Sequence, residues 1–365
     1  MKKEDWLYFS AHIHPILIIC AYYFNMPYTF MGLFLFLIAL FIALDFFIQR
    51  DKSYPYEQVI ATVENDGRFS PWLYQFATAS YFFVYLVALC MGLYYVQFKE
   101  PFLAWLSYSF FLGYCGSITM DQCHEYFHHT NPIEQFISRF FLSLSFSNSY
   151  EYEHLFNHHD EHTICTEKDC SYAKLNESCY EFMYKYVTYS GSKAIEVQKR
   201  LCEQGGYSFY NIFKNTLLKW TIISFLIPIV ILIFIGWKAL LFYLIQGQIS
   251  IFFNLLGSYH QHYGLSRRMK PDGTIEPFTF MNTWGIDHFF SGKADFNMFH
   301  HGHHHLFSFC RYPHLKLVEY GPLMKYGFHA TIFLSLFPKL WFKNINPKVE
   351  EVFKLRDQLE KEGKL

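Results

Sequence analysis

Long apolar segments alternate with polar, histidine-rich segments along this chain of 365 residues. A helix that crosses a bilayer needs about 20 mostly apolar residues, and four segments meet this requirement readily: 31–48, 74–96, 220–235 and 239–256. Two further segments, 7–23 and 102–119, are less apolar, because the first contains two histidines and a proline and the second is rich in serine, tyrosine and glycine. The pattern predicts six transmembrane helices.

The distribution of charge predicts how these helices are oriented. Pairing the six segments gives three hairpins, whose short links at 25–29, 99–101 and 236–238 carry almost no positive charge. Lysine and arginine concentrate on the opposite side, which the positive-inside rule places in the cytoplasm or in an equivalent compartment such as the mitochondrial matrix. We therefore expect an all-α, polytopic membrane protein whose two termini share that side. Residues 1–365 would form a single membrane domain, with a helical cap built from 120–219 and 257–365.

Composition narrows the class of protein further. Only 17% of the residues are charged, whereas soluble domains carry about 25%. A net charge of −1 offers no basic surface to nucleic acid, so the lipid bilayer is an expected partner and nucleic acid is not. Nine cysteines occur without a C-x-x-C pair. This excludes a fused rubredoxin or zinc ribbon, because the thiolate ligands of those modules come as closely spaced pairs.

Four histidine clusters, at 124–129, 153–159, 259–264 and 300–305, carry the candidate chemistry. His124 and His128 are spaced i and i+4, as are His154 and His158, so each pair is expected to share a helical face and chelate one metal ion. His159 lies beside the second pair and can reach a second ion. Imidazole suits iron, zinc and copper. Because eight or nine imidazoles exceed what one ion accepts, the clusters predict two metal ions.

The clusters resemble the histidine boxes of the integral-membrane alkane and xylene monooxygenases, within the wider fatty-acid desaturase-like superfamily. That family has H-E-x-x-H-K, E-H-x-x-G-H-H, N-Y-x-E-H-Y-G and L-Q-R-H-S-D-H-H, and the matching segments here are 124–129, 153–159, 258–264 and 298–305. The D-G-x-x-E-P motif at 272–277 also matches, as do Trp284 and His288. The resemblance covers residues from about 40 to 350.

Several positions depart from the family pattern. His129 replaces the lysine of the first box and Asn157 the glycine of the second, while Ser258 and Gln261 replace asparagine and glutamate in the third. In the fourth box, histidine, glycine and histidine at 300, 302 and 303 stand for arginine, serine and aspartate. Two frames for its ligands are therefore possible, one starting at His300 and one at His301. Counting without gaps from the flanking motifs favours the second frame.

The resemblance implies a site with two iron ions held by nine histidines: His124, His128, His154, His158, His159, His262, His301, His304 and His305. Glu125 and Glu153 flank ligands and are the catalytic candidates, together with Asp121 before the first box. They would relay protons or hold imidazole N–H groups in the required tautomer.

The resemblance also implies a reaction. We expect a non-haem di-iron monooxygenase that inserts one oxygen atom from O2 into an unactivated C–H bond of an alkane, an alkyl aromatic or a fatty acyl chain, with terminal hydroxylation favoured. The hydrophobic substrate would enter from the lipid, along a channel for which Ile118, Phe146 and Leu255 are candidates. Electrons would come from a separate rubredoxin- or ferredoxin-like protein. Its basic docking surface would include Lys168, Lys174, Arg267, Arg268 and Arg311.

Two alternatives stay open. One is a desaturase or hydroxylase that acts on a thioester-bound acyl chain, although the box order and the Gln261–Gly264 element argue against it. The other is a non-catalytic relative that serves as a subunit of a larger membrane assembly, a reading supported by the altered residues around the boxes. Metal content separates the second alternative from the two enzymes.

Overall fold

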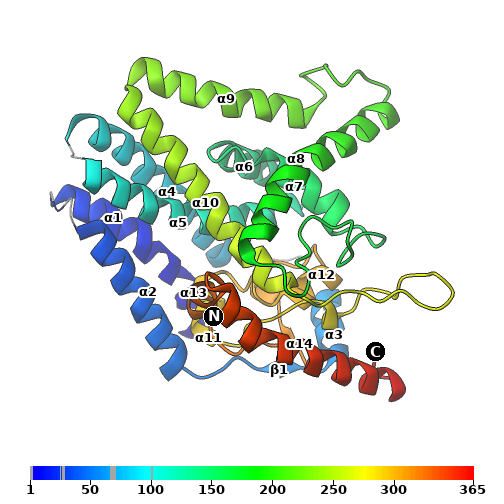
Figure 1. Cartoon of the computed structure of the whole chain (residues 1–365). Helices are drawn as coiled ribbons and strands as arrows, with labels where there is room; N and C mark the ends of the chain where they lie inside the picture. The colour runs from blue at the N-terminus through cyan, green and yellow to red at the C-terminus, as the bar shows by residue number, and fades with distance from the viewer. Residues whose placement is uncertain (1–2, 25, 27–28, 66–70, 100–101) are drawn as a thin grey trace.

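The computed structural model describes residues 3–24, 26, 29–65, 71–99 and 102–365 and is built mainly from helices (Figure 1). The helices before the second histidine box are η1 (Lys3–His12), α1 (Ile13–Tyr23), α2 (Phe30–Phe47), α3 (Tyr56–Asn65), α4 (Trp72–Phe98), α5 (Phe102–Phe127) and α6 (Pro132–Ser143). Those that follow are α7 (Asn148–Glu153), the π-helix η3 (His154–His158), α8 (Cys179–Gln204), α9 (Thr216–Phe234), α10 (Trp237–His262), η4 (Phe280–Asn282), α11 (Phe289–Ala294), α12 (His301–Leu306), η5 (Tyr312–His314), α13 (Phe328–Ser335) and α14 (Pro338–Lys361). Strand β1 (Ser53–Tyr54) pairs in parallel with β2 (Leu317–Val318).

Four of the described helices are long and apolar enough to cross a membrane: α2, α4, α9 and α10. They correspond to the four strongest predicted spans. The predicted span 7–23 is divided between the 3-10 helix η1 and the short helix α1, and the predicted span 102–119 forms the first part of α5. A total of six spans stays a prediction.

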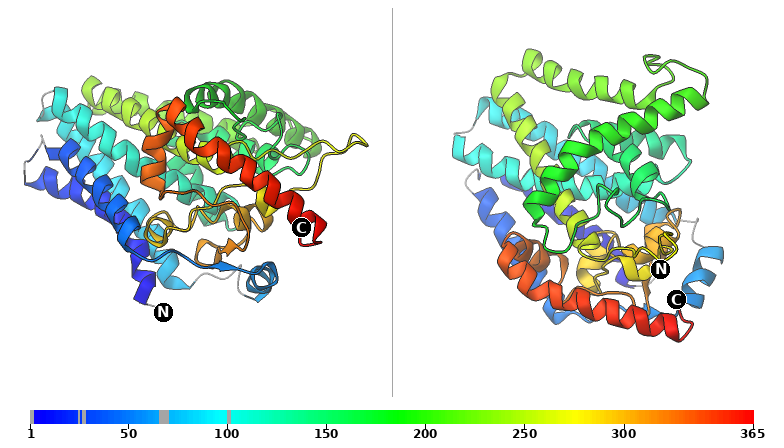
Figure 2. Two further views of the ribbon diagram at one scale, coloured as in Figure 1. Left: turned by 60° about the horizontal axis from the view of Figure 1, so that its bottom comes forward. Right: turned by 45° about the vertical axis from the view of Figure 1, so that its right-hand side comes forward.

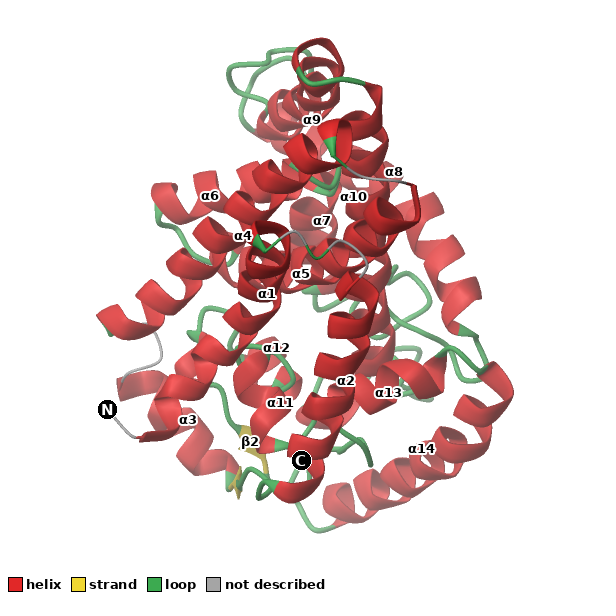
Figure 3. Ribbon diagram, turned by 90° about the vertical axis from the view of Figure 1, so that its left-hand side faces the viewer, coloured by secondary structure: helices red, strands yellow, loops and turns green. Residues whose placement is uncertain are grey.

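Helices α5 and α10 pack against each other at the centre of the bundle, as Figure 3 shows from the side. Small residues allow this close approach: a Cβ atom added at Gly113 would lie 2.6 Å from Ile249 of α10. Both helices continue without a break from the bundle into a histidine box, α5 ending just after His124 and α10 ending at His262. This continuity places the first and third boxes side by side at one end of the bundle.

The remaining boxes lie in the cap, and several contacts fix the cap to the bundle. Asp45, at the end of α2, accepts hydrogen bonds from the backbone N–H (2.9 Å) and the hydroxyl of Ser291 in α11. Tyr8 of η1 accepts hydrogen bonds from Lys293 (2.9 Å) and Asn297 (2.7 Å). These contacts hold η1 at the cap end of the molecule, where the last turn of α14 also lies (Figures 1 and 2).

Candidate metal centre

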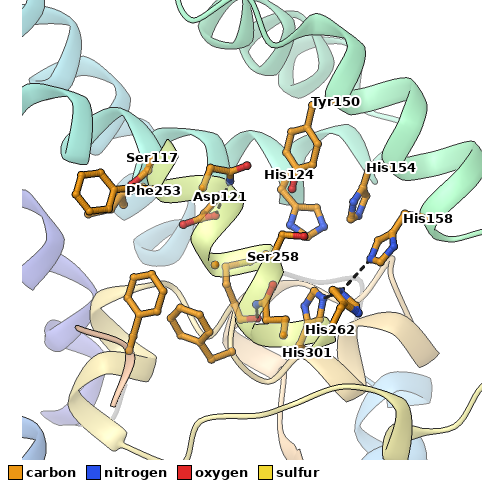
Figure 4. A pocket seen from close by; sticks show the side chains of 17 residues that line it. Ser117, Asp121, His124, Tyr150, His154, His158, Phe253, Ser258, His262 and His301 are labelled. Atoms are coloured by element: carbon orange, nitrogen blue, oxygen red, sulfur yellow. Dashed lines mark hydrogen bonds between the residues drawn. The ribbon is translucent and has the colours of Figure 1, made fainter. Parts of the chain in front are cut away.

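All four boxes meet where the cap covers the ends of α5 and α10. The nine predicted ligands form two groups, within each of which one nitrogen per residue lies within 4.8 Å of the others. The first group, called group one, is His124, His128, His154, His159 and His304, and the second, called group two, is His158, His262, His301 and His305. Figure 4 shows five of these side chains beside a cavity.

The nitrogens of group two point at one another. The Nε2 atoms of His262 and His301 are 2.9 Å apart, and those of His158 and His262 are 3.0 Å apart. His305 Nε2 lies 3.0 Å from His301 Nε2 and 3.2 Å from His158 Nε2. A neutral imidazole has one N–H, so these converging nitrogens cannot each find a suitable hydrogen-bond partner in the others. Lone pairs that converge in this way fit a metal ion.

The nitrogens of group one also fit a metal ion, and here the evidence is buried nitrogens that have no hydrogen-bond partner. His124 Nε2 is 3.0 Å from His304 Nε2. The Nε2 atoms of His128, His154 and His159 are buried and have no hydrogen-bond partner among the described residues. Buried polar atoms in proteins are almost always satisfied, so three unpartnered imidazole nitrogens facing one point indicate a metal site. The donor set is nitrogen only, which suits iron, zinc or copper and not calcium or magnesium.

The second box divides its histidines between the groups in a way that differs from the prediction. His154 and His158 were expected to share one ion, but His154 lies in group one and His158 in group two. The reason is local: residues 154–158 form a π-helix, in which the N–H of His159 donates to the carbonyl of His154 at 2.9 Å. The wider turn aligns residues i and i+5. His154 therefore pairs with His159, and His158 faces the other group.

The structure also distinguishes the two frames of the fourth box. His301, His304 and His305 lie in the groups, and His300 and His303 do not. His300 places one ring nitrogen 2.9 Å from the carbonyl of Leu315 and the other 3.3 Å from a carboxylate oxygen of Asp51. His303 Nδ1 accepts a hydrogen bond from the backbone N–H of Lys316 at 2.9 Å. The geometry agrees with the frame that starts at His301.

Electrostatics in the cap keep most of these imidazoles neutral, as metal binding requires. Burial, reinforced by the neighbouring histidines, lowers the pKa of five cap histidines: His154, His159, His301, His304 and His305. The pKa of His304 falls to about 3. His158 is the exception, since burial alone would lower its pKa but the buried carboxylate of Asp169, 2.9 Å from its Nδ1, raises it. Asp169 is fixed in turn by the backbone N–H groups of Cys165 and Ser171.

The two predicted catalytic glutamates lie close to the ligands but do not line the cavity. Glu125 accepts a hydrogen bond from the backbone N–H of Tyr312 at 3.1 Å. Glu153 is buried and accepts one from the hydroxyl of Tyr186 at 3.2 Å, and burial raises the pKa of Glu153 to about 7. Both side chains connect box-bearing helices to neighbouring elements.

The cavity beside the metal groups is small, about 30 Å³, and is lined by both polar and apolar side chains. His124, His154, His158, His262 and His301 form its metal side. Ile118, Phe253 and Phe328 form part of its apolar lining. Of the three candidate channel residues, Ile118 lines this cavity, whereas Phe146 and Leu255 do not. Asp121, labelled in Figure 4, is the one carboxylic acid among the described lining residues, and it accepts a hydrogen bond from Asn254 at 3.2 Å.

Sequence reasoning identified Asp121 and missed most of the other lining residues, although a signal was present. Counting back from His262 in steps of four gives Ser258 and Asn254, and counting back from His124 in steps of three or four gives Asp121 and Ser117. All four line the cavity. Helical spacing from a ligand identifies the residues on the same helix face.

The expected basic docking surface is largely neutralised within the chain. Lys174 pairs with Glu167, Arg268 with Glu276 and two acids of α14, and Arg311 with Glu134. Arg267 donates to backbone carbonyls. The three ion-paired cations therefore offer less free positive charge than the sequence suggests.

Comparisons with known proteins give the family. The profile of the fatty acid desaturase family matches residues 100–331. The chain is 26% identical to "Alkane 1-monooxygenase 2" of Alcanivorax borkumensis over 100% of this chain and 95% of that one. It is 23% identical to "Alkane 1-monooxygenase" of Acinetobacter baylyi (85% and 74%) and 23% identical to "Alkane 1-monooxygenase" of Ectopseudomonas oleovorans (84% and 75%). Together with its four apolar helices and histidine clusters, these matches show that the chain belongs to the fatty acid desaturase family, as an integral-membrane oxidoreductase similar to the alkane 1-monooxygenases.

Proposed function

We propose that this protein is a non-haem di-iron monooxygenase that inserts one oxygen atom from O2 into an unactivated C–H bond of a hydrophobic substrate, with terminal hydroxylation favoured. The observation that carries the proposal is the pair of histidine groups at the wall of a half-apolar cavity. An all-nitrogen site next to apolar side chains suits oxidation of a substrate that has no charged group to bind.

The nine histidines of groups one and two would hold the two irons, which supply the reaction with O2 that abstracts hydrogen and delivers oxygen. The protein contributes position and exclusion of water. Phe253, Phe299 and Phe328 would hold the substrate chain against the metal side of the cavity. Asp121 would hold a proton on the carboxyl group that faces the cavity, and Asn254 fixes the orientation of that group. Asp169 would keep the Nδ1 proton of His158, leaving its Nε2 atom for the metal.

Glu125 and Glu153 have supporting parts in this proposal. Glu125 connects the first box to Tyr312, beyond the fourth box, and Glu153 connects the second box to α8 through Tyr186. We assign both a positioning role, because neither carboxylate reaches the cavity.

The partners of the reaction follow from the location of the site. We place the cap and both termini on the cytoplasmic or matrix side, on the strength of the charge distribution, and the hydrophobic substrate in the lipid. The electrons come from a separate rubredoxin- or ferredoxin-like protein. His128, His159 and His305 are the half-buried members of the two groups, so a donor that docks above them has the shortest path to the metals.

Metal analysis and product analysis test the proposal together. Purified protein in lipid nanodiscs should contain two irons per chain and, with O2 and a reduced ferredoxin, convert a series of n-alkanes to terminal alcohols. Less than one metal per chain would reject every catalytic function and favour a non-catalytic subunit. Activity restricted to acyl thioesters would replace hydrocarbon hydroxylation by the desaturase or acyl-hydroxylase alternative, and the His154→Ala variant serves as the inactive control.

A further inference from the structure

A second cavity lies between α7, α8 and α9, away from the metal groups, and we call it the α8–α9 cleft. It has a volume of about 350 Å³, and its lining is mostly apolar: Phe146, Ile195, Phe209, Leu217 and Phe225 are among its residues. Two of its polar residues are paired, because Asn148 accepts a hydrogen bond from the hydroxyl of Ser224 and its amide donates to the hydroxyl of Ser143. No charged residue lines the cleft, so it offers no charge to bind an ion.

The residues around the cleft are of the kind expected at a membrane surface. It is lined by Leu217 and Phe225, which belong to the first half of the membrane-crossing candidate α9. Lys214, Lys219 and Trp220 flank the start of that helix, and lysine and tryptophan are the residues that anchor a span at the lipid–water boundary. Only 22% of the apolar stretch of α9 is buried in the structure, so the cleft adjoins a helix face that would contact lipid in a membrane.

Helix α7 separates the cleft from the metal cavity. Asn148 and Ser149 line the cleft, whereas Tyr150, the next residue, lines the metal cavity (Figure 4). Phe146, in the turn before α7, has a left-handed backbone conformation with φ of 59°, which is unusual for a bulky residue. Its ring contacts Phe225 of α9 at a centroid distance of 5.6 Å and Tyr243 of α10 at 6.2 Å. Backbone strain of this kind is concentrated at functional sites.

We propose that the α8–α9 cleft binds an unbranched hydrocarbon chain drawn from the bilayer and is the entrance through which substrate passes Phe146 to the metal cavity. The cleft and the cavity then form one route for the substrate. Helix α7 and Phe146 separate the two cavities and would move to let the chain pass. The entrance role rests on the proposed monooxygenase function, whereas binding of a hydrocarbon chain to the cleft does not.

A glycine makes the proposal testable without disrupting the fold. Gly191 lines the cleft, and a Cβ atom added there would meet no atom within 4 Å. Gly191→Leu should therefore place a side chain in the cleft, starting from a Cβ atom that meets no neighbour. Gly32 in α2 has equally open surroundings away from the cleft, so Gly32→Leu is a matched control.

The experiment uses full-length protein in nanodiscs and an n-alkane with a terminal diazirine as photoprobe. Illumination should label residues of α8 and α9 at the cleft, in protein with its metals and in protein stripped of them. Gly191→Leu should reduce that labelling about tenfold and raise the KM for n-alkanes by a similar factor, with kcat and iron content unchanged. Gly32→Leu should match the unmodified protein.

Three results would overturn the proposal in different parts. Labelling confined to the metal cavity, or equal labelling of the Gly191→Leu and Gly32→Leu variants, would reject the cleft as a hydrocarbon site. An unchanged KM in Gly191→Leu despite lost labelling would reject the entrance role. A labelled cleft in a protein that hydroxylates no hydrocarbon would reject the monooxygenase function and the entrance role, while the hydrocarbon site would stand.

Discussion

His300 and His301 are neighbours in sequence and have unrelated surroundings. The ring of His301 faces His262 and His305, while that of His300 lies between the carbonyl of Leu315 and the carboxylate of Asp51. The two residues therefore contribute differently to the molecule: one offers a lone pair to the centre of group two, and the other connects the fourth box to the loop after α2.

This difference gives a test of the ligand frame. His301→Ala should remove a ligand and reduce the metal content of group two, because three imidazoles remain where four converge. His300→Ala should keep both metals and lose only thermal stability. Metal content is measured by mass spectrometry on the purified variants. A full metal complement in His301→Ala together with metal loss in His300→Ala would show that the other frame is correct.

Asp169 provides a second test at this scale. Asp169→Asn keeps the shape of the side chain but removes the charge beside His158 Nδ1. Partners of this kind typically contribute 10–100-fold to metal affinity, so chelator titration should show metal lost from group two about 10-fold more readily. The exposed pair Lys174–Glu167 supplies the control: Glu167→Gln should leave metal affinity unchanged. Equal affinity in the unmodified protein and Asp169→Asn would mean that the carboxylate has no part in holding the ligand.

At the scale of elements, the central contact is that of α5 with α10, since these two helices carry the first and third boxes. A Cβ atom at Gly113 would lie 2.6 Å from Ile249 and 2.8 Å from the backbone carbonyl of Gln246. The backbone cannot yield easily, so a larger residue must push the helices apart. Any such displacement is transmitted along both helices to His124 and His262.

Gly113→Val should accordingly reduce stability by about 1–3 kcal/mol, the usual cost of overpacking, and should also reduce metal content. Gly32→Val, in open surroundings on α2, should do neither. Thermal unfolding in detergent and metal analysis give the two readouts. Normal metal content in a destabilised Gly113→Val protein would show that the contact supports the bundle without positioning the boxes.

Much of the fold and of the site could be predicted from sequence, and the exceptions have physical causes. Apolar segments of sufficient length predicted α2, α4, α9 and α10, and the resemblance to the histidine boxes of a known family supplied the set of nine histidines that the structure brings together. The division of residues 7–23 into η1 and α1 could not be predicted from local sequence. Tyr8 accepts hydrogen bonds from Lys293 and Asn297 of the cap, which are nearly 300 positions away in the chain. The grouping of His154 and His158 depends on a π-helix that spacing alone does not reveal.

At the scale of the whole molecule, the cap and the bundle act as one unit only if the contacts between them hold. Asp45 is the clearest of these contacts, because it is buried at the end of α2 and accepts two hydrogen bonds from Ser291 of the cap. The metal groups lie at this junction, with ligands from α5 and α10 on one side and from α12 on the other.

Asp45→Ala should leave the backbone N–H of Ser291 without its acceptor, at a cost of about 1–3 kcal/mol. We expect a lower unfolding temperature and faster loss of metal to a chelator, because the fourth box moves with the cap. Asp45→Asn retains an acceptor oxygen and should have a smaller effect on both measurements. If Asp45→Ala unfolds earlier but holds its metals normally, the cap is fixed at the metal groups by the ligands themselves.

The π-helix η3 has a further consequence, which concerns how many ions one helix can serve. In an α-helical turn, His154 and His158 would face one group, and only His159 could reach the other. The extra residue in the turn directs His154 and His159 to one group and His158 to the other, so a single stretch of chain contributes to both groups. Deleting Asn157 would restore an ordinary helical register, and the second box would then contribute to one ion instead of two.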